Sequence, residues 1–211
     1  MYVKKLKMRV ISPFYYYTHG GQIASPGDFL GDIALFYALA YSLKGLDFPL
    51  HDLRQEHLAS LDFMVTVGKP LHLKMKSAMI VASVFKDALH KFRDFYARIG
   101  GSFAYKNIRK IKPIDAGSIF ESYIISRCDY KLPKEFGLRI GVNRDGVLNV
   151  TIEEPNLDDE IWLNLFTLRS KGIPYQNFLK NIIEVAIFNR YYTIIKGVKL
   201  KDFLNIARKY I

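Results

Sequence analysis

A strand followed by a helix is predicted by the stretch VKKLKMRVISPFYYYTHGGQIASPGDFLGDIALFYALAYSLKG, residues 3–45. Its first part, Val3–Tyr17, is rich in β-branched and aromatic residues, with apolar and polar positions alternating. Pro13 cannot donate a backbone hydrogen bond, so we expect the strand to be broken there. His19-Gly20-Gly21 is then expected to form a turn.

The second part of the stretch has the marks of a helix start. Ser25 is a candidate N-cap, Pro26 suits the first helical position, and Asp28 completes a capping box. Apolar residues then recur at helical spacing over Leu30–Tyr41, and Gly45 is suited to end the helix.

The remaining chain predicts further strands and helices. In order they are a strand pair or hairpin at Leu61–Leu73, a helix at Ala82–Ile99, a basic loop or strand at Ser102–Lys112, a strand at Ile119–Cys128, a hairpin at Gly137–Ile152, an acidic loop at Glu153–Glu160, a helix at Pro174–Tyr191 and an amphipathic helix at Leu200–Ile211.

This order favours an α+β fold with a ferredoxin-like antiparallel sheet, as in modified RNA-recognition domains. We expect residues 1–152 to form that domain, including a basic helical insertion at 69–112. Residues 153–211 are expected to form a helical C-terminal extension packed on it. An RNA-recognition sheet would carry aromatic side chains on its open face.

The positive charge of the chain is concentrated in one segment. The net charge is +11, from 31 basic and 20 acidic residues. Residues 69–112 hold eleven basic residues against two acidic ones, a balance of +9. Aromatic residues are interleaved with them, namely Phe85, Phe92, Phe95, Tyr96, Phe103 and Tyr105. This pattern favours nucleic-acid contact. The alternative is a solvated helix face whose aromatic residues lie in the core.

Composition argues against several other classes of protein. The single cysteine, Cys128, allows no disulfide and no cysteine-based zinc site within one chain, and its apolar surroundings predict a buried, inert thiol. No apolar run resembles a signal peptide or a membrane span. Membrane-surface binding by a basic helix remains an alternative. His51, His57, His72 and His90 lack metal-ligand spacing, so we expect no metal and no cofactor.

Two local features allow a functional and a structural interpretation. Tyr15-Tyr16-Tyr17 could present a ring for base stacking or could pack at a strand edge. His19 could act as general base in metal-independent RNA cleavage or could be an ordinary loop histidine. The acidic residues of 153–160 predict a solvated loop or a contact for a basic partner subunit.

The opening of the chain resembles a known family. The residues that carry the likeness are Phe14-Tyr15-Tyr16-Tyr17-Thr18, a glycine turn, Pro26-Gly27-Asp28-Phe29-Leu30 and Ile33-Ala34-Leu35-Phe36-Tyr37-Ala38-Leu39. This pattern is similar to the small Cas-five-type subunit of type I-D CRISPR effector complexes, a member of the RAMP superfamily. Residues 46–150 resemble it in layout, and the C-terminal third hardly does.

The resemblance implies a role in binding guide RNA. Such a subunit has a modified RNA-recognition sheet, caps the 5′ handle of the crRNA and separates handle from guide with a protruding thumb. The implied partners are the crRNA, the backbone and large subunits of the effector and, as a further candidate, target DNA near the PAM end. No membrane is implied, and the location is cytoplasmic. Lys69–Lys112 would then be the thumb-like insertion and handle-binding surface.

Some relatives in other subtypes cleave the RNA precursor with a tyrosine, lysine and histidine set. In type I-D the processing nuclease is usually a separate protein, so we expect a non-catalytic subunit. The alternatives are a metal-independent endoribonuclease with His19 as base, and a basic adaptor that binds only proteins. The candidate RNA-binding residues are Tyr15, Tyr17, His19, Lys74, Lys76, Phe103, Tyr105, Lys106, Arg109, Lys110, Lys112 and Arg127.

Overall fold

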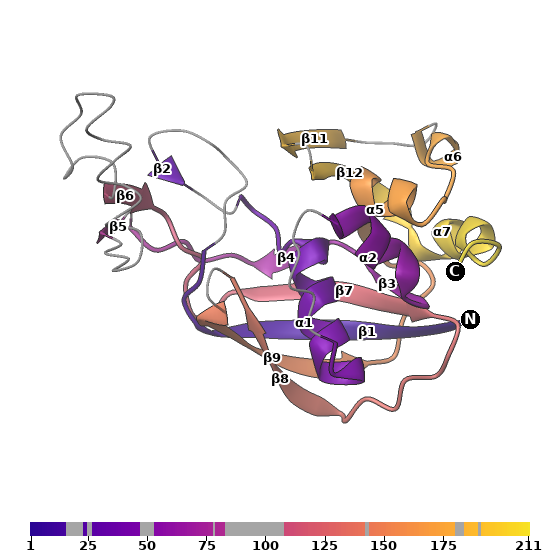
Figure 1. Ribbon diagram of the computed structural model, residues 1–211, viewed down its shortest axis with the longest axis horizontal. Helices are drawn as coiled ribbons and strands as arrows, with labels where there is room; N and C mark the ends of the chain where they lie inside the picture. Colours follow the sequence, from indigo (N-terminus) through magenta and orange to yellow (C-terminus); the bar gives the residue numbers. More distant parts are fainter. Residues whose placement is uncertain are drawn as a thin grey trace.

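An antiparallel sheet forms the centre of the computed structural model (Figure 1). The structure describes residues 1–15, 23–24, 27–46, 53–77, 79–82, 108–141, 144–179, 184–189 and 191–211. The strands of this main sheet lie in the order β3-β7-β1-β9-β8, and β4 also pairs with β7. Their bounds are β1 (Tyr2–Ser12), β3 (Phe63–Val65), β4 (Lys69–His72), β7 (Ile119–Ser126), β8 (Glu135–Ile140) and β9 (Gly146–Glu153).

The order of the strands is that of a modified ferredoxin-like fold. Central β1 pairs with β7 and β9, while β3 and β4 flank β7, and every pairing is antiparallel. Helix α1 (Asp32–Lys44) lies in the connection from β1 to β3. A ferredoxin-like fold has a second helix between its third and fourth strands. Here residues 127–134 form a loop in that place, and β8 adds a strand beside β9. The expected α+β class is confirmed.

Alternation along β1 separates the two faces of the main sheet. Leu6, Met8 and Val10 are buried in the core beneath α1, whereas Lys7 and Arg9 are exposed on the opposite face. This division follows from the two-residue period of a strand. The sequence pattern of residues 3–10 therefore orients the whole sheet.

Helix α1 begins later than the sequence predicts. Its N-cap is Gly31, not Ser25, which lies outside the described residues. Gly27 has a φ of 83°, a left-handed conformation that a helix excludes. Leu30 is held in an extended bridge, because its N–H and C=O both bond to Gly68. The predicted end is confirmed, since Gly45 has a φ of 64° and donates to the carbonyl of Tyr41.

Two strands are present within Leu61–Leu73, as expected, but the prediction that they form a hairpin is wrong. Strands β3 and β4 do not pair with each other, and both pair in turn with β7. Between them Val67 donates to Trp162 O and Gly68 bonds to Leu30, so the backbone there leaves the strand for other partners. Gly-Lys-Pro resembles a turn, but here it belongs to an interrupted edge strand, where proline is tolerated.

The basic segment 69–112 contains strands at both ends. Its first residues form β4, and β5 (Met79–Ala82) pairs antiparallel with β6 (Ile108–Ile111). The short β2 (Ile23–Ala24) runs parallel to β6. These three strands lie at one end of the molecule, far from α7 and the chain termini (Figure 1). The helix expected at Ala82–Ile99 lies outside the described residues except for Ala82, which belongs to β5.

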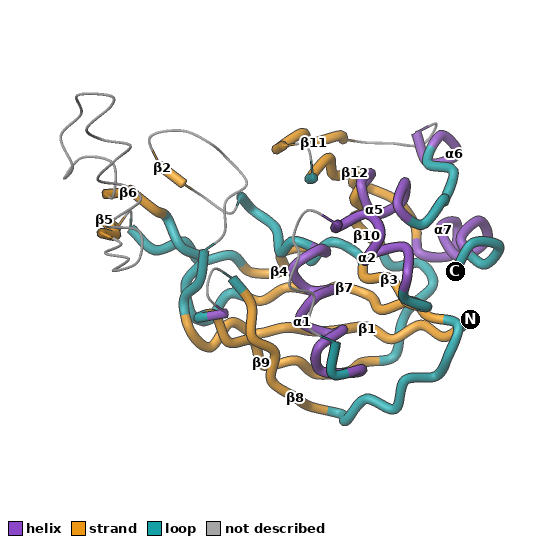
Figure 2. The backbone as a smooth tube through the Cα atoms, in the orientation of Figure 1, coloured by secondary structure: helices purple, strands orange, loops and turns teal. Residues whose placement is uncertain are grey.

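Residues 159–211, here called the C-terminal unit, combine helices with a second sheet (Figure 2). The elements are β10 (Glu160–Asn164), α5 (Leu165–Ser170), α6 (Gln176–Leu179), β11 (Glu184–Asn189), β12 (Tyr192–Lys199) and α7 (Leu200–Ala207), and the strand order is β10-β12-β11. The helix predicted at Pro174–Tyr191 is wrong over its second half. That half is β11, which pairs with β12, so tertiary pairing overrides the helical spacing.

The C-terminal unit covers part of the second face of the main sheet. Met64, Tyr123 and Ile125 from that face share a buried cluster with Phe203 and Leu204 of α7. The expected amphipathic helix at the C-terminus and the hairpin β8–β9 are both present. A further short helix, α2 (Arg54–Ser60), lies between α1 and β3. No helix in the described ranges has the length and apolar character needed to cross a bilayer.

Candidate nucleic-acid interface

Three chain segments meet where the main sheet joins the basic insertion. Ile114 forms antiparallel bridges with Phe14 on one side and Met75 on the other. The N–H of Ile114 donates to Phe14 O at 2.9 Å, and Lys76 N donates to Pro113 O at 2.9 Å. We call residues 13–15, 74–76 and 112–115 the crossing. It holds together parts of the chain that are about 60 and 40 residues apart.

Exposed lysines gather at the crossing. Leu73 and Met75 pack against the main core, while the alternating positions Lys74 and Lys76 are exposed. Lys112 is exposed between buried Ile111 and Pro113. None of these three lysines makes an ion pair with another residue of the described segments. Three of the predicted phosphate-binding residues are therefore brought together.

The other candidates are distributed differently. Tyr15 is half-buried at the crossing, directly after Phe14. Arg109 and Lys110 lie in β6, which connects to the crossing through Ile111. Tyr17, His19, Phe103, Tyr105 and Lys106 lie outside the described residues. The segment that holds Tyr17 and His19 is flanked by Tyr15 and Ile23. Tyr15 lies at the crossing, and Ile23 lies beside β6.

Arg127 is separated from the lysines of the crossing. Ser118, whose hydroxyl accepts from Lys74 N at 2.9 Å, precedes β7, whereas Arg127 follows it. About 30 Å of extended chain lies between these two ends. Arg127 is exposed, and its N–H donates to Asp62 O. The structure therefore does not place Arg127 with the other predicted phosphate contacts.

The sequence analysis missed basic residues on the face of the main sheet that lies opposite α1. We call this side the open face. Arg9 on β1 and Arg139 on β8 are exposed, and His72 on β4 is exposed opposite Ile119. Charge balance over residues 1–68 is zero, which concealed Arg9 within a neutral segment. The alternation of β1 was the signal that could have placed Arg9 on the polar face.

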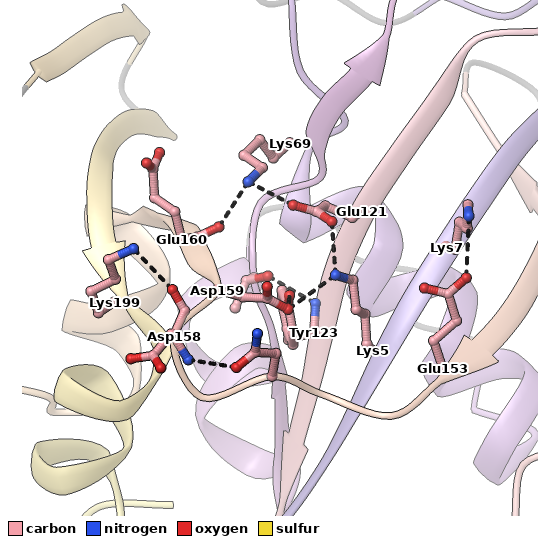
Figure 3. A network of polar contacts seen from close by, with 12 residues as sticks. Lys5, Lys7, Lys69, Glu121, Tyr123, Glu153, Asp158, Asp159, Glu160 and Lys199 are labelled. Carbon is pink, nitrogen blue, oxygen red and sulfur yellow. Dashed lines mark hydrogen bonds and ion pairs between the residues drawn. The ribbon is translucent and has the colours of Figure 1, made fainter.

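The other end of the same face is a network of paired charges (Figure 3). Lys5 Nζ lies 3.0 Å from Glu121 Oε2 and 3.0 Å from Asp159 Oδ2. Lys69 Nζ lies 2.6 Å from Glu121 Oε1 and donates to the Glu160 carbonyl at 3.1 Å. Lys69 was expected to belong to the RNA-binding surface, but its charge is neutralised within the fold.

The network shifts the pKa values of its members. Lys5 and Asp159 are held charged, and Tyr123 is held neutral. Burial alone would lower the pKa of Lys5, but hydrogen bonds to Asp159 and Glu121 outweigh it and raise the pKa above its ordinary value. Burial acts to raise the pKa of Asp159, yet the hydrogen bonds from Tyr123 and Lys5 lower it. Burial, followed by the hydrogen bond to Asp159, raises the pKa of Tyr123. All three groups are therefore held in one charge state at neutral pH.

Much of the acidic loop is engaged within the chain. Glu153 lies 3.3 Å from Lys7, Asp159 pairs with Lys5, and Asp158 lies 2.7 Å from Lys201. The Asp158 pair is exposed, in accord with the expected solvated loop, whereas Asp159 is half-buried against the sheet. Asp159 thus connects the C-terminal unit to β1.

Aromatic residues do not form a stacking platform on the described open face. Tyr123 belongs to this face but is buried under the C-terminal unit, where its hydroxyl donates to Asp159. The neighbouring positions Lys7, Arg9, Asn149 and Thr151 are polar. The aromatic open face expected of an RNA-recognition sheet is therefore wrong for the described strands.

Within the described residues, neither a metal-ligand cluster nor an activated cysteine is found. In the described ranges no three His, Cys, Asp or Glu side chains gather as metal ligands. Cys128, predicted to be buried, is exposed because it follows the end of β7. Its hydrogen bond to Asp62 raises the pKa of the thiol, which disfavours the nucleophilic thiolate.

Comparisons with known proteins give one family. A model of the family described as "Type I-D CRISPR-associated protein Cas5/Csc1" matches residues 1–202. No curated protein matches the chain. A solved structure, "Cryo-EM structure of the Type III-B Cmr-beta bound to cognate target RNA and AMPPnP, state 1", contains a similar chain. The identity is 10%, the TM-score is 0.43, and the match covers 99% of this chain and 90% of that one.

Proposed function

Because the chain belongs to the type I-D CRISPR-associated Cas5/Csc1 family, we propose that it is a non-catalytic RNA-binding subunit of a type I-D interference complex. The observation that carries the proposal is the group of exposed lysines at the crossing. Lys74, Lys76 and Lys112 lie beside the strands from which the basic insertion leaves and returns. Cations that form no ion pair within the described part of the chain are available to neutralise phosphates, which releases condensed counterions and favours binding.

The finer parts of the proposal concern what the subunit binds. Residues 1–152 with the basic insertion bind the 5′ handle of the crRNA, and residues 153–211 support that domain from the second face of the sheet. Lys106, Arg109, Lys110 and Lys112 contact phosphates, while Tyr17, Phe103 and Tyr105 stack on bases. Other surfaces dock the backbone and large subunits in the cytoplasm, and target DNA near the PAM end is a further ligand.

A salt series on matched variants tests the phosphate contacts. Labelled CRISPR-repeat RNA is titrated with the wild type, with Lys74→Ala/Lys76→Ala/Lys112→Ala, and with Lys131→Ala/Lys134→Ala/Lys209→Ala. The control removes the same charge from exposed lysines away from the crossing. For single-stranded RNA each lost contact lowers the salt slope by about 0.7, so the first variant should lose about 2 and the control nearly nothing. Equal losses would contradict the proposal.

The same titration separates the competing functions. It is run in EDTA and resolved on native and denaturing gels. A shifted and intact RNA supports the binding subunit, whereas a discrete product that disappears in His19→Ala favours the endoribonuclease. A wild type that shifts no RNA at low salt favours the protein-binding adaptor. A scrambled RNA of equal length as competitor tests preference for the handle.

A further inference from the structure

The residues on the open face of the main sheet differ between the two ends of its strands. Residues that face each other across antiparallel strands lie on the same side of the sheet. Towards the C-terminal unit, the facing pairs are Tyr123 with Lys5 and Glu121 with Lys7. Towards the crossing, Arg9 faces Ile119 on β7 and Asn149 on β9.

The second of these regions is basic. Its members are His72 on β4, Arg9 on β1 and Arg139 on β8, with the polar Asn149 of β9 between the two arginines. We call these four residues the basic end. Neighbouring strands are about 4.8 Å apart, so His72 and Arg139 each start about 10 Å from Arg9, on opposite sides of it, and about 19 Å from each other. His72 precedes Lys74 and Lys76 on one alternating row, which makes the basic end continuous with the crossing.

The cations of the basic end are not neutralised as those of the network are. Lys5, Lys7 and Lys69 each have a carboxylate within 3.3 Å. For Arg9 and Arg139, no ion pair is formed with any residue whose position the structure describes.

The acids nearest in the chain and sheet have other partners or lie in turns. Glu135 accepts from Asn149 Nδ2 at 2.6 Å, and Asp115 accepts from the Ala116 N–H at 2.9 Å. Asp145 lies in the β8–β9 turn, where its carbonyl accepts from the Ser12 hydroxyl. The donors to Glu135 and Asp115 are uncharged, so these acids keep their charge. With the crossing included, the five exposed cations Arg9, Arg139, Lys74, Lys76 and Lys112 still outnumber the three acids, so this end of the face is net positive while the other is internally balanced.

The chemistry of the basic end selects phosphates over bases. The large rings of Phe, Tyr and Trp, on which bases stack best, are absent from these four residues and from their facing partners Ile119, Gly137 and Val147. Exposed guanidinium groups on rigid strands suit the oxygen atoms of a sugar–phosphate backbone.

From this arrangement we infer that the basic end binds the sugar–phosphate backbone of single-stranded RNA without base stacking. It extends the RNA path from the crossing onto the open face of the main sheet. This inference rests on the proposed function, because the RNA is the one held at the crossing. The site is a phosphate track in the place where an RNA-recognition sheet would stack bases.

The test compares two arginine pairs. Arg9→Ala/Arg139→Ala removes the cations of the basic end, and the control Arg169→Ala/Arg208→Ala removes two exposed arginines of the C-terminal unit. Binding to 30-nucleotide oligo(A) and oligo(U) is measured across a salt series. We expect the first variant to lower the salt slope by about 1.4 on both RNAs and the control to leave it unchanged. Arg9→Lys/Arg139→Lys should restore the slope, which separates lost charge from a damaged fold.

Other outcomes overturn the inference. Equal slopes for the two alanine pairs would remove the basic end from the RNA path, and an effect confined to one RNA would indicate base contact. If the wild type binds and only Lys74→Ala/Lys76→Ala/Lys112→Ala weakens binding, this inference fails and the proposed function stands. If the wild type binds no RNA, the proposed function fails as well.

Discussion

Asp32 is the buried acid that joins helix α1 to the C-terminal unit. Its side chain is 1% exposed, and it accepts hydrogen bonds from Asn164 Nδ2 at 2.9 Å and from the Thr167 hydroxyl. Burial raises the pKa of Asp32 to about 6, although these hydrogen bonds oppose the rise. The residue also occupies the first turn of α1, where a negative charge is favoured by the helix dipole.

The raised pKa predicts a loss of stability as the pH rises. Between the unfolded value of 3.8 and the folded value of about 6, the folded state keeps a proton that the unfolded state has released. The free energy of unfolding therefore falls with pH across this window, by about 3 kcal/mol from this residue, and stays level above it. In Asp32→Asn that fall should be absent.

Urea unfolding of both proteins at intervals from pH 4 to pH 7.5 measures this effect. Relative to the wild type, Asp32→Asn should become more stable as the pH rises. A constant difference would show that Asp32 does not hold a raised pKa. Asp32→Ala should be less stable than Asp32→Asn at every pH, because it removes the acceptor of the Thr167 hydroxyl and one of the two acceptors of the Asn164 amide.

At the scale of elements, the interruption between β3 and β4 determines how α1 enters the fold. Gly68 exchanges two backbone hydrogen bonds with Leu30, at 2.8 and 2.9 Å, just before α1 begins. A Cβ atom at position 68 would lie 2.6 Å from Leu30 Cβ, which is too close for any packed pair. The absence of a side chain at Gly68 thus allows its backbone to come close enough to Leu30 for both hydrogen bonds to form.

Gly68→Ala should therefore destabilise the fold by about 1–3 kcal/mol, the usual range for overpacking a core. Gly137→Ala is the matched control, because its added Cβ would meet only the Leu148 carbonyl at 3.9 Å. That variant should be neutral or slightly more stable. Thermal unfolding of both variants measures the difference, and similar melting temperatures would refute the role assigned to Gly68.

The pairing of β5 with β6 makes a second prediction about elements. Ala82 faces Ile108 in the antiparallel ladder, so an Asn-Gly turn can join them in place of residues 83–107. The described main core is built from residues on both sides of this segment, so we expect the shortened chain to fold. Its affinity for CRISPR-repeat RNA should fall, since the deletion removes Lys86, Lys91, Arg93, Arg98 and Lys106. Unchanged RNA affinity in a folded deletion variant would contradict the role proposed for the insertion.

At the scale of the whole molecule, the two ends of the open face differ in charge: cations near the C-terminal unit are paired, and cations near the insertion are exposed. The C-terminal unit lies over one end of the open face and supplies Asp159 and the Glu160 carbonyl to Lys5 and Lys69. The insertion leaves from the other end, where Arg9, Lys74 and Arg139 remain exposed. Along the open face, the arginines without an ion pair among the described residues therefore lie toward the region where we propose that RNA binds.

Local patterns were enough to predict several elements. The strands β1 and β7, the hairpin β8–β9, the end of α1 at Gly45 and the helix α7 follow from alternation, turn residues and helical spacing. These signals depend on neighbours within a few residues. The resemblance to the family also rests on such a local stretch, residues 14–39.

By itself the sequence determined the α+β class, the family and the concentration of charge in residues 69–112, because each depends on residues close together in the chain. Only the tertiary structure decided that 184–189 is a strand, that β3 and β4 pair with β7, and that Lys69 is neutralised while Arg9 is not. Strand pairing and ion pairing depend on partners that are distant in the chain. Lys5 and Asp159 are 154 residues apart, and only folding brings them together.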